Sequence, residues 1–137
     1  MSNNSCCISD ILNTIVILQN NCNKVENTPN SCDSPILGLR ETNCFAYNTR
    51  PLNLYNCNGT LLTFPYSITN NGTEITGESS ALRVEKVENC CAVCRVLAPN
   101  PDETATNPYV TTNDFVTVNL ECTCIIKCLT DTYISCL

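Results

Sequence analysis

Residues 81–97 read Ala-Leu-Arg-Val-Glu-Lys-Val-Glu-Asn-Cys-Cys-Ala-Val-Cys-Arg-Val-Leu, and this stretch decides the fold class. Its first half alternates, because Leu82 and Val84 fall on one face of an extended chain and the charged residues after them fall on the other. Its second half is rich in valine and cysteine, which suit a pleated and half-buried surface. The pattern therefore predicts two β-strands, Ala81–Glu88 and Cys91–Leu97.

Strand-like segments recur through the rest of the chain. Asn58-Gly59 lies between two of them and is a strong signal for a hairpin turn. A second Asn-Gly pair lies within 68–80, which has little apolar content and is expected to form a loop or a weak edge hairpin. The segment 99–112 contains three prolines and is expected to be a long loop. The further strands that the pattern predicts are Phe45–Asn48, Leu52–Cys57, Thr60–Tyr66, Phe115–Leu120 and Cys122–Leu129.

The N-terminal region has a different period. Apolar residues from Ile8 to Cys22 recur with helical spacing, although the run at 15–18 is also good strand material, so a β-rich arm is the competing interpretation. We expect this helix or arm, flanked by cysteines, to occupy residues 1–24, and a single domain to occupy 25–137. About six to eight short strands in that domain favour an all-β fold, an antiparallel β-sandwich or a jelly-roll-like barrel.

Composition excludes several functional classes. The chain has 137 residues with 13 acidic and 7 basic side chains, and a net charge of −6 without a basic cluster argues against a nucleic-acid partner. Histidine is absent, which excludes catalytic arrangements that use imidazole as the base and zinc sites that include histidine. We therefore expect no enzyme and no cofactor. No apolar run reaches the roughly 18 residues that span a membrane.

The cysteine content is the strongest functional signal. Thirteen cysteines exceed what a domain of this size needs for stability, and they indicate an oxidising environment. Because the count is odd, full oxidation leaves at least one cysteine to bond another chain or to stay free. The N-terminus lacks the basic residues and the cleavage site of a signal peptide. We therefore expect synthesis in a reducing cytosol, later oxidation, and covalent links between chains.

Two cysteine clusters allow alternative interpretations. In an extended chain Cys122, Cys124 and Cys128 share one face, so they are set to bond another strand, loop or chain rather than one another, unless they are core residues or metal ligands. Cys91 and Cys94 fall on opposite faces of a strand, which weakens a metal or redox C-x-x-C site. A four-thiolate zinc site made by these two residues with Cys122 and Cys124 remains an alternative.

Each cysteine receives an expected role. The two termini are expected to be accessible, so Cys6, Cys7 and Cys136 are the candidates for disulfides between chains. The other cysteines are candidates for disulfides within the chain or at a packed interface. They are Cys22, Cys32, Cys44, Cys57, Cys90, Cys91, Cys94, Cys122, Cys124 and Cys128.

Several segments carry a family resemblance. Residues 82–97 resemble the "RVE…CAVLRVL" block of the CotY/CotZ/ExsY group, which are spore outer-coat and exosporium proteins of bacilli. Residues 115–129 are similar to that group's closing motif, a strand followed by C-x-C-x-x-x-C-L. Residues 49–55 and the layout of Cys6/Cys7 and Cys22 also fit. The resemblance covers most of the chain.

The resemblance implies a non-enzymatic structural protein that self-assembles into ordered, disulfide-hardened sheets on the endospore surface. It implies synthesis in the mother-cell cytosol without a signal peptide, and a final location in the coat or exosporium. Its partners would be copies of itself and other coat, exosporium or appendage proteins. Two alternatives are an anchor that links an appendage fibre to that layer, and a zinc-binding interaction module.

The match to that group is uneven along the chain. The cysteines that match it position by position are Cys91, Cys122, Cys124 and Cys128, whereas Cys32 matches by layout only. The departures are the absence of histidine and the extra cysteines Cys90, Cys94 and Cys136.

Overall fold

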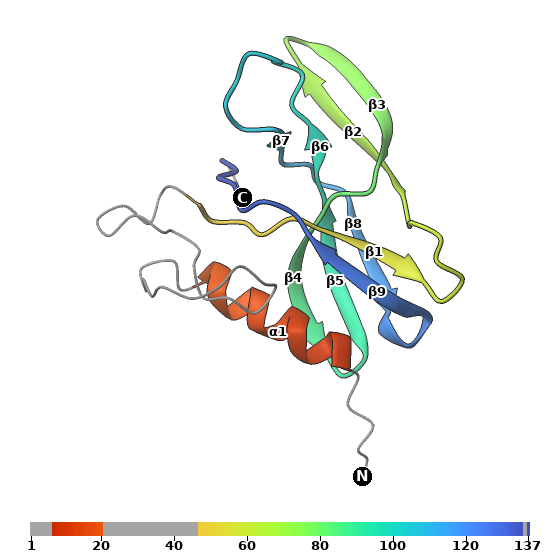
Figure 1. Cartoon of the computed structure of the whole chain (residues 1–137). Helices are drawn as coiled ribbons and strands as arrows, with labels where there is room; N and C mark the ends of the chain where they lie inside the picture. Colours follow the sequence, from red (N-terminus) through yellow and green to blue (C-terminus); the bar gives the residue numbers. More distant parts are fainter. Residues whose placement is uncertain (1–6, 21–46, 136) are drawn as a thin grey trace.

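A five-stranded antiparallel sheet is the main element of the chain. The computed structural model describes residues 7–20, 47–135 and 137. The sheet has the strand order β8-β5-β4-β1-β9, and helix α1 (Cys7–Asn20) packs on one of its faces (Figure 1). No helix in these ranges is long and apolar enough to cross a membrane. The strands of the sheet are β1 (Leu52–Asn56), β4 (Leu82–Glu88), β5 (Cys91–Val96), β8 (Phe115–Asn119) and β9 (Thr123–Cys128).

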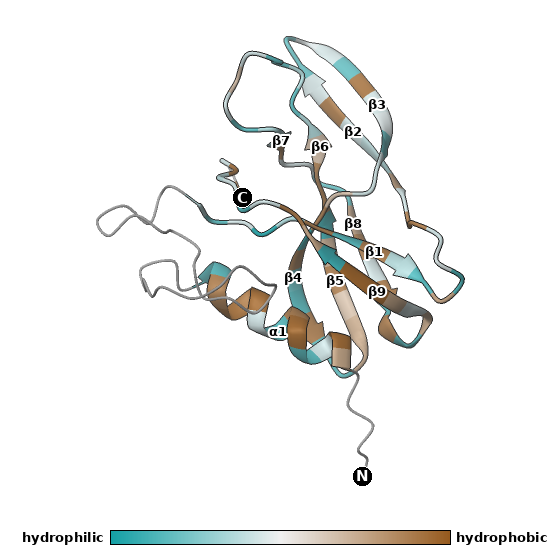
Figure 2. Ribbon diagram, viewed as in Figure 1, coloured by the Kyte–Doolittle hydropathy of each residue, from teal (hydrophilic) through white to brown (hydrophobic). Residues whose placement is uncertain are grey.

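The core forms where the apolar faces of the sheet and the helix meet. Leu82 and Val84 of β4 are fully buried, as the alternation predicts. Leu12 and Ile15 lie one helical turn apart and are fully buried in the same cluster. Figure 2 shows hydrophobic residues on α1 and along β5 and β9, whereas the hairpin of β2 (Phe64–Asn70) and β3 (Thr73–Ser79) is mostly pale or polar. The predicted helix thus forms because its apolar stripe has a sheet to cover.

Polar contacts fix α1 on the sheet at both ends. Gln19 Nε2 donates to the carbonyl of Val84 at 2.9 Å, and Gln19 Oε1 accepts from the amide of Arg50 at 3.0 Å; both bonds are buried. Near the helix start, Ser9 Oγ donates to the carbonyl of Asn89 at 2.8 Å, in the turn between β4 and β5. These bonds place the first residues of α1 beside that turn.

The second Asn-Gly pair makes a regular hairpin. Strands β2 (Phe64–Asn70) and β3 (Thr73–Ser79) pair along their whole length. At the turn, Asn71 and Gly72 have φ angles of 54° and 78°, as a type I′ turn requires. Of the two alternatives for 68–80, the hairpin is therefore confirmed and the loop is wrong, because turn chemistry outweighs the low apolar content.

The first Asn-Gly turn forms, but the expected hairpin is confirmed only next to the turn, where the amide of Asn56 donates to the carbonyl of Thr60 and that of Leu62 to the carbonyl of Leu54. After Asn58-Gly59 the chain meets β1 only at one bridge, between Tyr55 and Leu61. The second half of the predicted strand Thr60–Tyr66 pairs with β3 instead. The reason is that β1 is already hydrogen-bonded to β4 on one side and to β9 on the other.

Two other expected segments differ in how much of them the structure describes. The segment 99–112 is mostly loop, closed by a short pair of β6 (Ala98–Pro99) with β7 (Tyr109–Val110). The strand expected over 45–48 starts outside the described residues, and Thr49 beyond it forms an isolated bridge with Thr132. Residues 23–43, where two prolines and many turn-forming residues predict a loop, also lie outside them.

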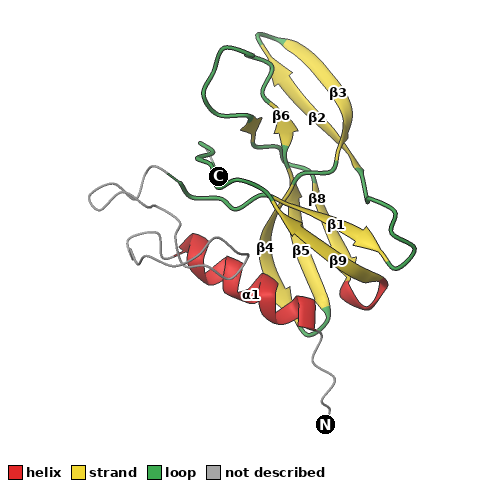
Figure 3. Cartoon of the chain, in the orientation of Figure 1, coloured by secondary structure: helices red, strands yellow, loops and turns green. Residues whose placement is uncertain are grey.

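The all-β antiparallel class with an N-terminal helix is confirmed. The side chains that cover the buried face of the five-stranded sheet come from α1 and from Phe64 and Tyr66 of β2. This layer takes the place of the second large sheet that a sandwich would have. The other sheets that the structure describes are two-stranded (Figure 3).

Candidate functional site

Two adjacent segments carry exposed free thiols at one end of the sheet. Cys91 begins β5 and lies opposite Asn119 at the end of β8. A short 3-10 helix, η2 (Leu120–Cys122), follows at once, and the Leu120 amide donates to the carbonyl of Cys90 at 2.7 Å. Asn119 caps η2 by accepting from the Glu121 amide. Cys91 and Cys122 are therefore neighbours at this end, and both are exposed and free.

A third free thiol comes to the same end from the helix. Cys7 is the first residue of α1, two positions before Ser9. The bond from Ser9 to Asn89 holds that helical turn against the β4–β5 turn, which leads directly into Cys91. Cys7 is exposed and its thiol is free.

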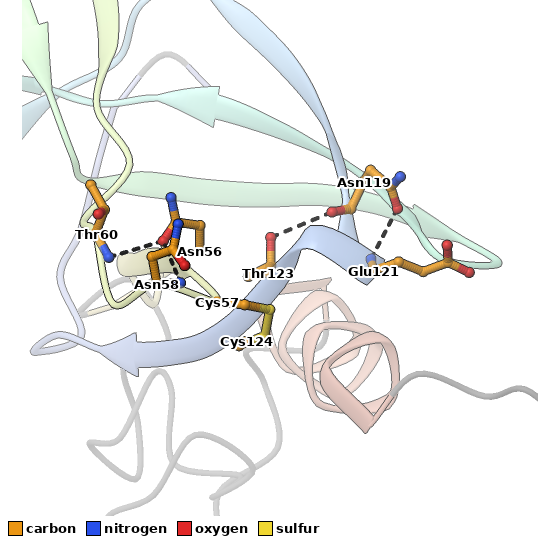
Figure 4. Close-up of a disulfide and its surroundings, with 8 residues drawn as sticks. All are labelled: Asn56, Cys57, Asn58, Thr60, Asn119, Glu121, Thr123 and Cys124. Atoms are coloured by element: carbon orange, nitrogen blue, oxygen red, sulfur yellow. Dashed lines mark hydrogen bonds between the residues drawn. A yellow bond between two sulfur atoms is a disulfide. The ribbon is translucent and has the colours of Figure 1, made fainter.

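The disulfide between Cys57 and Cys124 lies at the same end of the sheet (Figure 4). Cys57 lies in the turn after β1, where the Asn56 side chain accepts from the amides of Asn58 and Thr60 at 2.9 and 3.0 Å. Both cysteines are exposed. The hydrogen-bonded turn therefore presents the sulfur of Cys57 toward the start of β9.

A β-bulge explains why Cys124 faces solvent. The β1–β9 register runs from Tyr55–Ile125 to Asn56–Thr123, so Cys124 is the extra residue on β9. Beyond the bulge the alternation changes phase: Thr123 is buried and Cys124 is exposed, whereas Cys128 is half-buried at the core. The interpretation that Cys122, Cys124 and Cys128 share one strand face is wrong, since Cys122 also lies in η2 rather than in the strand.

We call this surface the sulfur-rich end. Among the described residues it holds every exposed cysteine, and none of these side chains belongs to the core. Glu88, Glu121 and Asp10 are exposed and lie within three positions of these cysteines in the sequence. Its members are Cys7, Cys57, Cys91, Cys122 and Cys124.

The other cysteines are placed elsewhere. Cys94 is fully buried in the core, on the opposite face of β5 from Cys91. Cys90 and Cys128 are half-buried and disulfide-bonded. The remaining candidates lie outside the described residues. They are Cys6, Cys22, Cys32, Cys44 and Cys136.

The four-thiolate zinc set is not assembled. Its four members would be Cys91, Cys94, Cys122 and Cys124, but Cys94 is buried while Cys91 faces solvent. The sulfur of Cys124 is bonded to Cys57 and is not a thiolate. No cluster of metal-ligating side chains occurs in the part of the chain that the structure describes.

Burial sets the chemistry of Cys94 apart from the exposed thiols. Desolvation, reinforced by the negative charge of Glu85, raises the pKa of the Cys94 thiol from 9.0 to about 12. The thiolate is the reactive form, so Cys94 is inert in the folded protein at neutral pH.

This pKa shift predicts a loss of stability at alkaline pH. Below pH 9 the Cys94 thiol is protonated in both the folded and the unfolded chain, and its contribution is fully present. Between pH 9 and about 12 only the unfolded chain ionises, so the free energy of unfolding falls by about 1.4 kcal/mol per pH unit. Urea unfolding across this range, after native alkylation of exposed thiols, measures the slope. We expect Cys94→Ala to lack this component, and equal slopes in the two proteins would contradict the assignment.

Sequence reasoning found the cysteines but missed the residues that position them. Ser9, Asn56 and Asn119 hold the three segments that converge at the sulfur-rich end. Asn56 and Asn119 are capping residue types next to predicted strand ends, which is the one local signal for their role. Ser9 is a residue type that can cap a helix, and nothing in its local sequence marks its contact with Asn89.

Comparison with known proteins gives one match. No curated protein and no solved structure matches the chain. The family model of spore coat protein Z matches residues 1–131, nearly the whole chain. The chain therefore belongs to the spore coat protein Z family, and its role is structural, in the coat at the spore surface.

Proposed function

We propose that this chain is a building block of a disulfide-cross-linked protein layer on the endospore surface, in which it bonds copies of itself and other coat proteins. The observation that carries the proposal is the sulfur-rich end, where three free thiols and one disulfide face solvent together. A free thiol on the surface adds nothing to the packing of the protomer. In an oxidising environment it is available to another chain.

Covalent links between protomers suit a dormant coat. A disulfide between chains makes disassembly depend on bond cleavage, so resistance to heat and denaturant becomes kinetic. The protomer itself holds together through its apolar core of α1 and the five-stranded sheet. This division supports a protein that folds first in the mother-cell cytosol and is cross-linked later.

The terminal cysteines are the proposed links to other protomers. Cys7 is exposed and free at the start of α1, and Cys6 precedes it directly. Cys136 is next to the last residue of the sequence. Thiols at two ends of a chain permit more than one neighbour, which a growing layer needs.

Denaturing gels test the proposed cross-linking. Protein that was purified with reductant and then oxidised in air should give dimers and larger species in boiling detergent. With a thiol reductant all of them should collapse to the 15.0 kDa chain. If boiling detergent without reductant releases only monomers, the proposed function is wrong.

The variant Cys6→Ser/Cys7→Ser tests the N-terminal links. We expect it to remain folded and to lose most of the species larger than a dimer, because the N-terminal links are gone while Cys136 and the core are untouched. Cys94→Ala is the matched control, and its buried thiol should leave the gel pattern unchanged. A double variant that forms the wild-type ladder would remove these residues from the proposal.

A further inference from the structure

The sulfur-rich end holds both reactants of a thiol–disulfide exchange. Cys122 is exposed and free, and only Thr123 separates it from Cys124, which is exposed and bonded to Cys57. A thiolate that attacks one sulfur of a disulfide forms a new disulfide and releases the other sulfur. Exposed disulfides are the ones that exchange most readily, because an attacking thiolate can reach them.

We propose that the Cys57–Cys124 disulfide is an exchange site at which Cys122 of a second copy of this chain attacks Cys124. The proposal deepens the proposed cross-linking function and rests on it. It assigns the first link between two protomers to defined atoms. It also lets that link form without an oxidant.

The reaction balances in sulfur, electrons and protons. Cys122 of the attacking copy loses its proton to water and bonds through Sγ to Cys124 Sγ of the other copy. The Cys57–Cys124 bond breaks, and its electron pair leaves with Cys57 Sγ, which takes up a proton from water. One disulfide is consumed and one is formed, so nothing is oxidised or reduced overall.

The position of the two groups favours reaction between chains. Within one chain Cys122 would have to bond a residue two positions away, across Thr123, whose backbone is extended (φ −115°, ψ 119°), and this geometry disfavours a disulfide. When two copies meet about a two-fold axis with their 122–124 segments antiparallel, Cys122 of each copy lies opposite Cys124 of the other. An isologous contact of this kind brings both thiols to both disulfides and closes a dimer.

The composition of this surface also favours a second copy of the chain as its partner. The same few residues present an attacking thiol and a disulfide to be attacked, so the surface is complementary to itself. Cys91 directly follows Cys90, but the sulfur of Cys90 is in a half-buried disulfide that a second copy reaches less readily than the exposed Cys57–Cys124 bond. Cys122 is therefore the attacking residue that the structure assigns.

Two complementary variants test the exchange directly. The donor is Cys57→Ser/Cys124→Ser, labelled with ¹⁵N, which keeps the Cys122 thiol. The acceptor is Cys122→Ser, which keeps the disulfide. Mixed without oxygen and with a metal chelator, they should form a reducible donor–acceptor adduct. Peptide mapping should join donor Cys122 to acceptor Cys124, and N-ethylmaleimide should label acceptor Cys57.

Matched variants separate this reaction from exchange elsewhere in the chain. Adding Cys122→Ser to the donor should reduce the adduct about tenfold or more, because the attacking thiolate is gone. Adding Cys91→Ser instead should leave its yield unchanged. An adduct that survives the loss of Cys122, or its absence from the original mixture, overturns the proposal.

Single variants and air oxidation keep the test decisive if the donor does not fold. Without oxygen, wild-type chains should then form reducible dimers that Cys122→Ser chains do not form, and equal dimer yields would overturn the proposal. If wild-type protein cross-links in air but not without oxygen, the exchange is wrong and the cross-linking function stands. If it cross-links under neither condition, the proposed function itself fails.

Discussion

Leu52→Ala is expected to lower the free energy of unfolding by about 2–5 kcal/mol, because it opens a cavity where the core cannot easily close. Leu52 is fully buried at the start of β1. It lies opposite Leu82 of β4 on one side and Cys128 of β9 on the other. The Leu52–Leu82 pair is the register contact that joins β1 to β4, so the substitution loosens the joint between the two parts of the sheet. Urea unfolding followed by circular dichroism measures the loss.

Leu61→Ala is the matched control for this prediction. Leu61 meets β1 only through a bridge to Tyr55, and its side chain is 37% exposed. We expect a change of no more than about 0.5 kcal/mol, as for other surface substitutions. An equal loss of unfolding free energy in the two variants would contradict the prediction, because the buried Leu52 would then contribute no more to stability than the exposed Leu61.

Local patterns in the sequence predicted most of the elements. Alternation at Leu82 and Val84 identified β4, and the apolar stripe through Leu12 and Ile15 identified α1. These predictions hold because each pattern is read within one element, and its buried face is the face that the sequence marks. The all-β class follows from the same signals.

Pairing between elements could not be predicted in the same way. The Asn58-Gly59 turn forms, yet Leu61 is the last residue after it that pairs with β1. On the side of β1 that Leu61 approaches, Leu82 of β4 already pairs with Leu52, and β9 pairs along the other side. Which strand pairs with β1 therefore depends on residues far away in the chain. The turn residues carry no information about that competition.

The candidate site shows the same limit. Cysteine content indicated covalent assembly, but the gathering of Cys7, Cys91 and Cys122 at one end follows from strand order and from the docking of the helix. The bulge at Cys124 shifts the alternation by one residue, and no turn former or glycine marks it in the sequence. A strict period of two therefore assigns Cys124 to the wrong face.

Removal of the exposed disulfide is expected to have the other large effect. Cys57→Ser/Cys124→Ser should lower the free energy of unfolding by about 2–4 kcal/mol, because the bond joins residues 67 positions apart and restricts the unfolded chain. The disulfides at Cys90 and Cys128 already restrict part of the unfolded ensemble, so the loss of unfolding free energy should not exceed about 4 kcal/mol. Urea unfolding of monomers whose exposed thiols are alkylated gives the difference.

Cys91→Ser/Cys122→Ser provides the comparison, since it removes two exposed sulfurs at the same end without removing a cross-link. It should change the free energy of unfolding by no more than about 0.5 kcal/mol.

In the folded state the β1–β9 ladder still pairs Tyr55 with Ile125 when the disulfide is absent, so the native circular dichroism of both variants should match the wild type. The loss of the bond therefore acts on the unfolded chain, and the folded protomer can give it up in an exchange. Equal unfolding midpoints for the disulfide variant and the wild type would show that the cross-link does not restrict the unfolded chain.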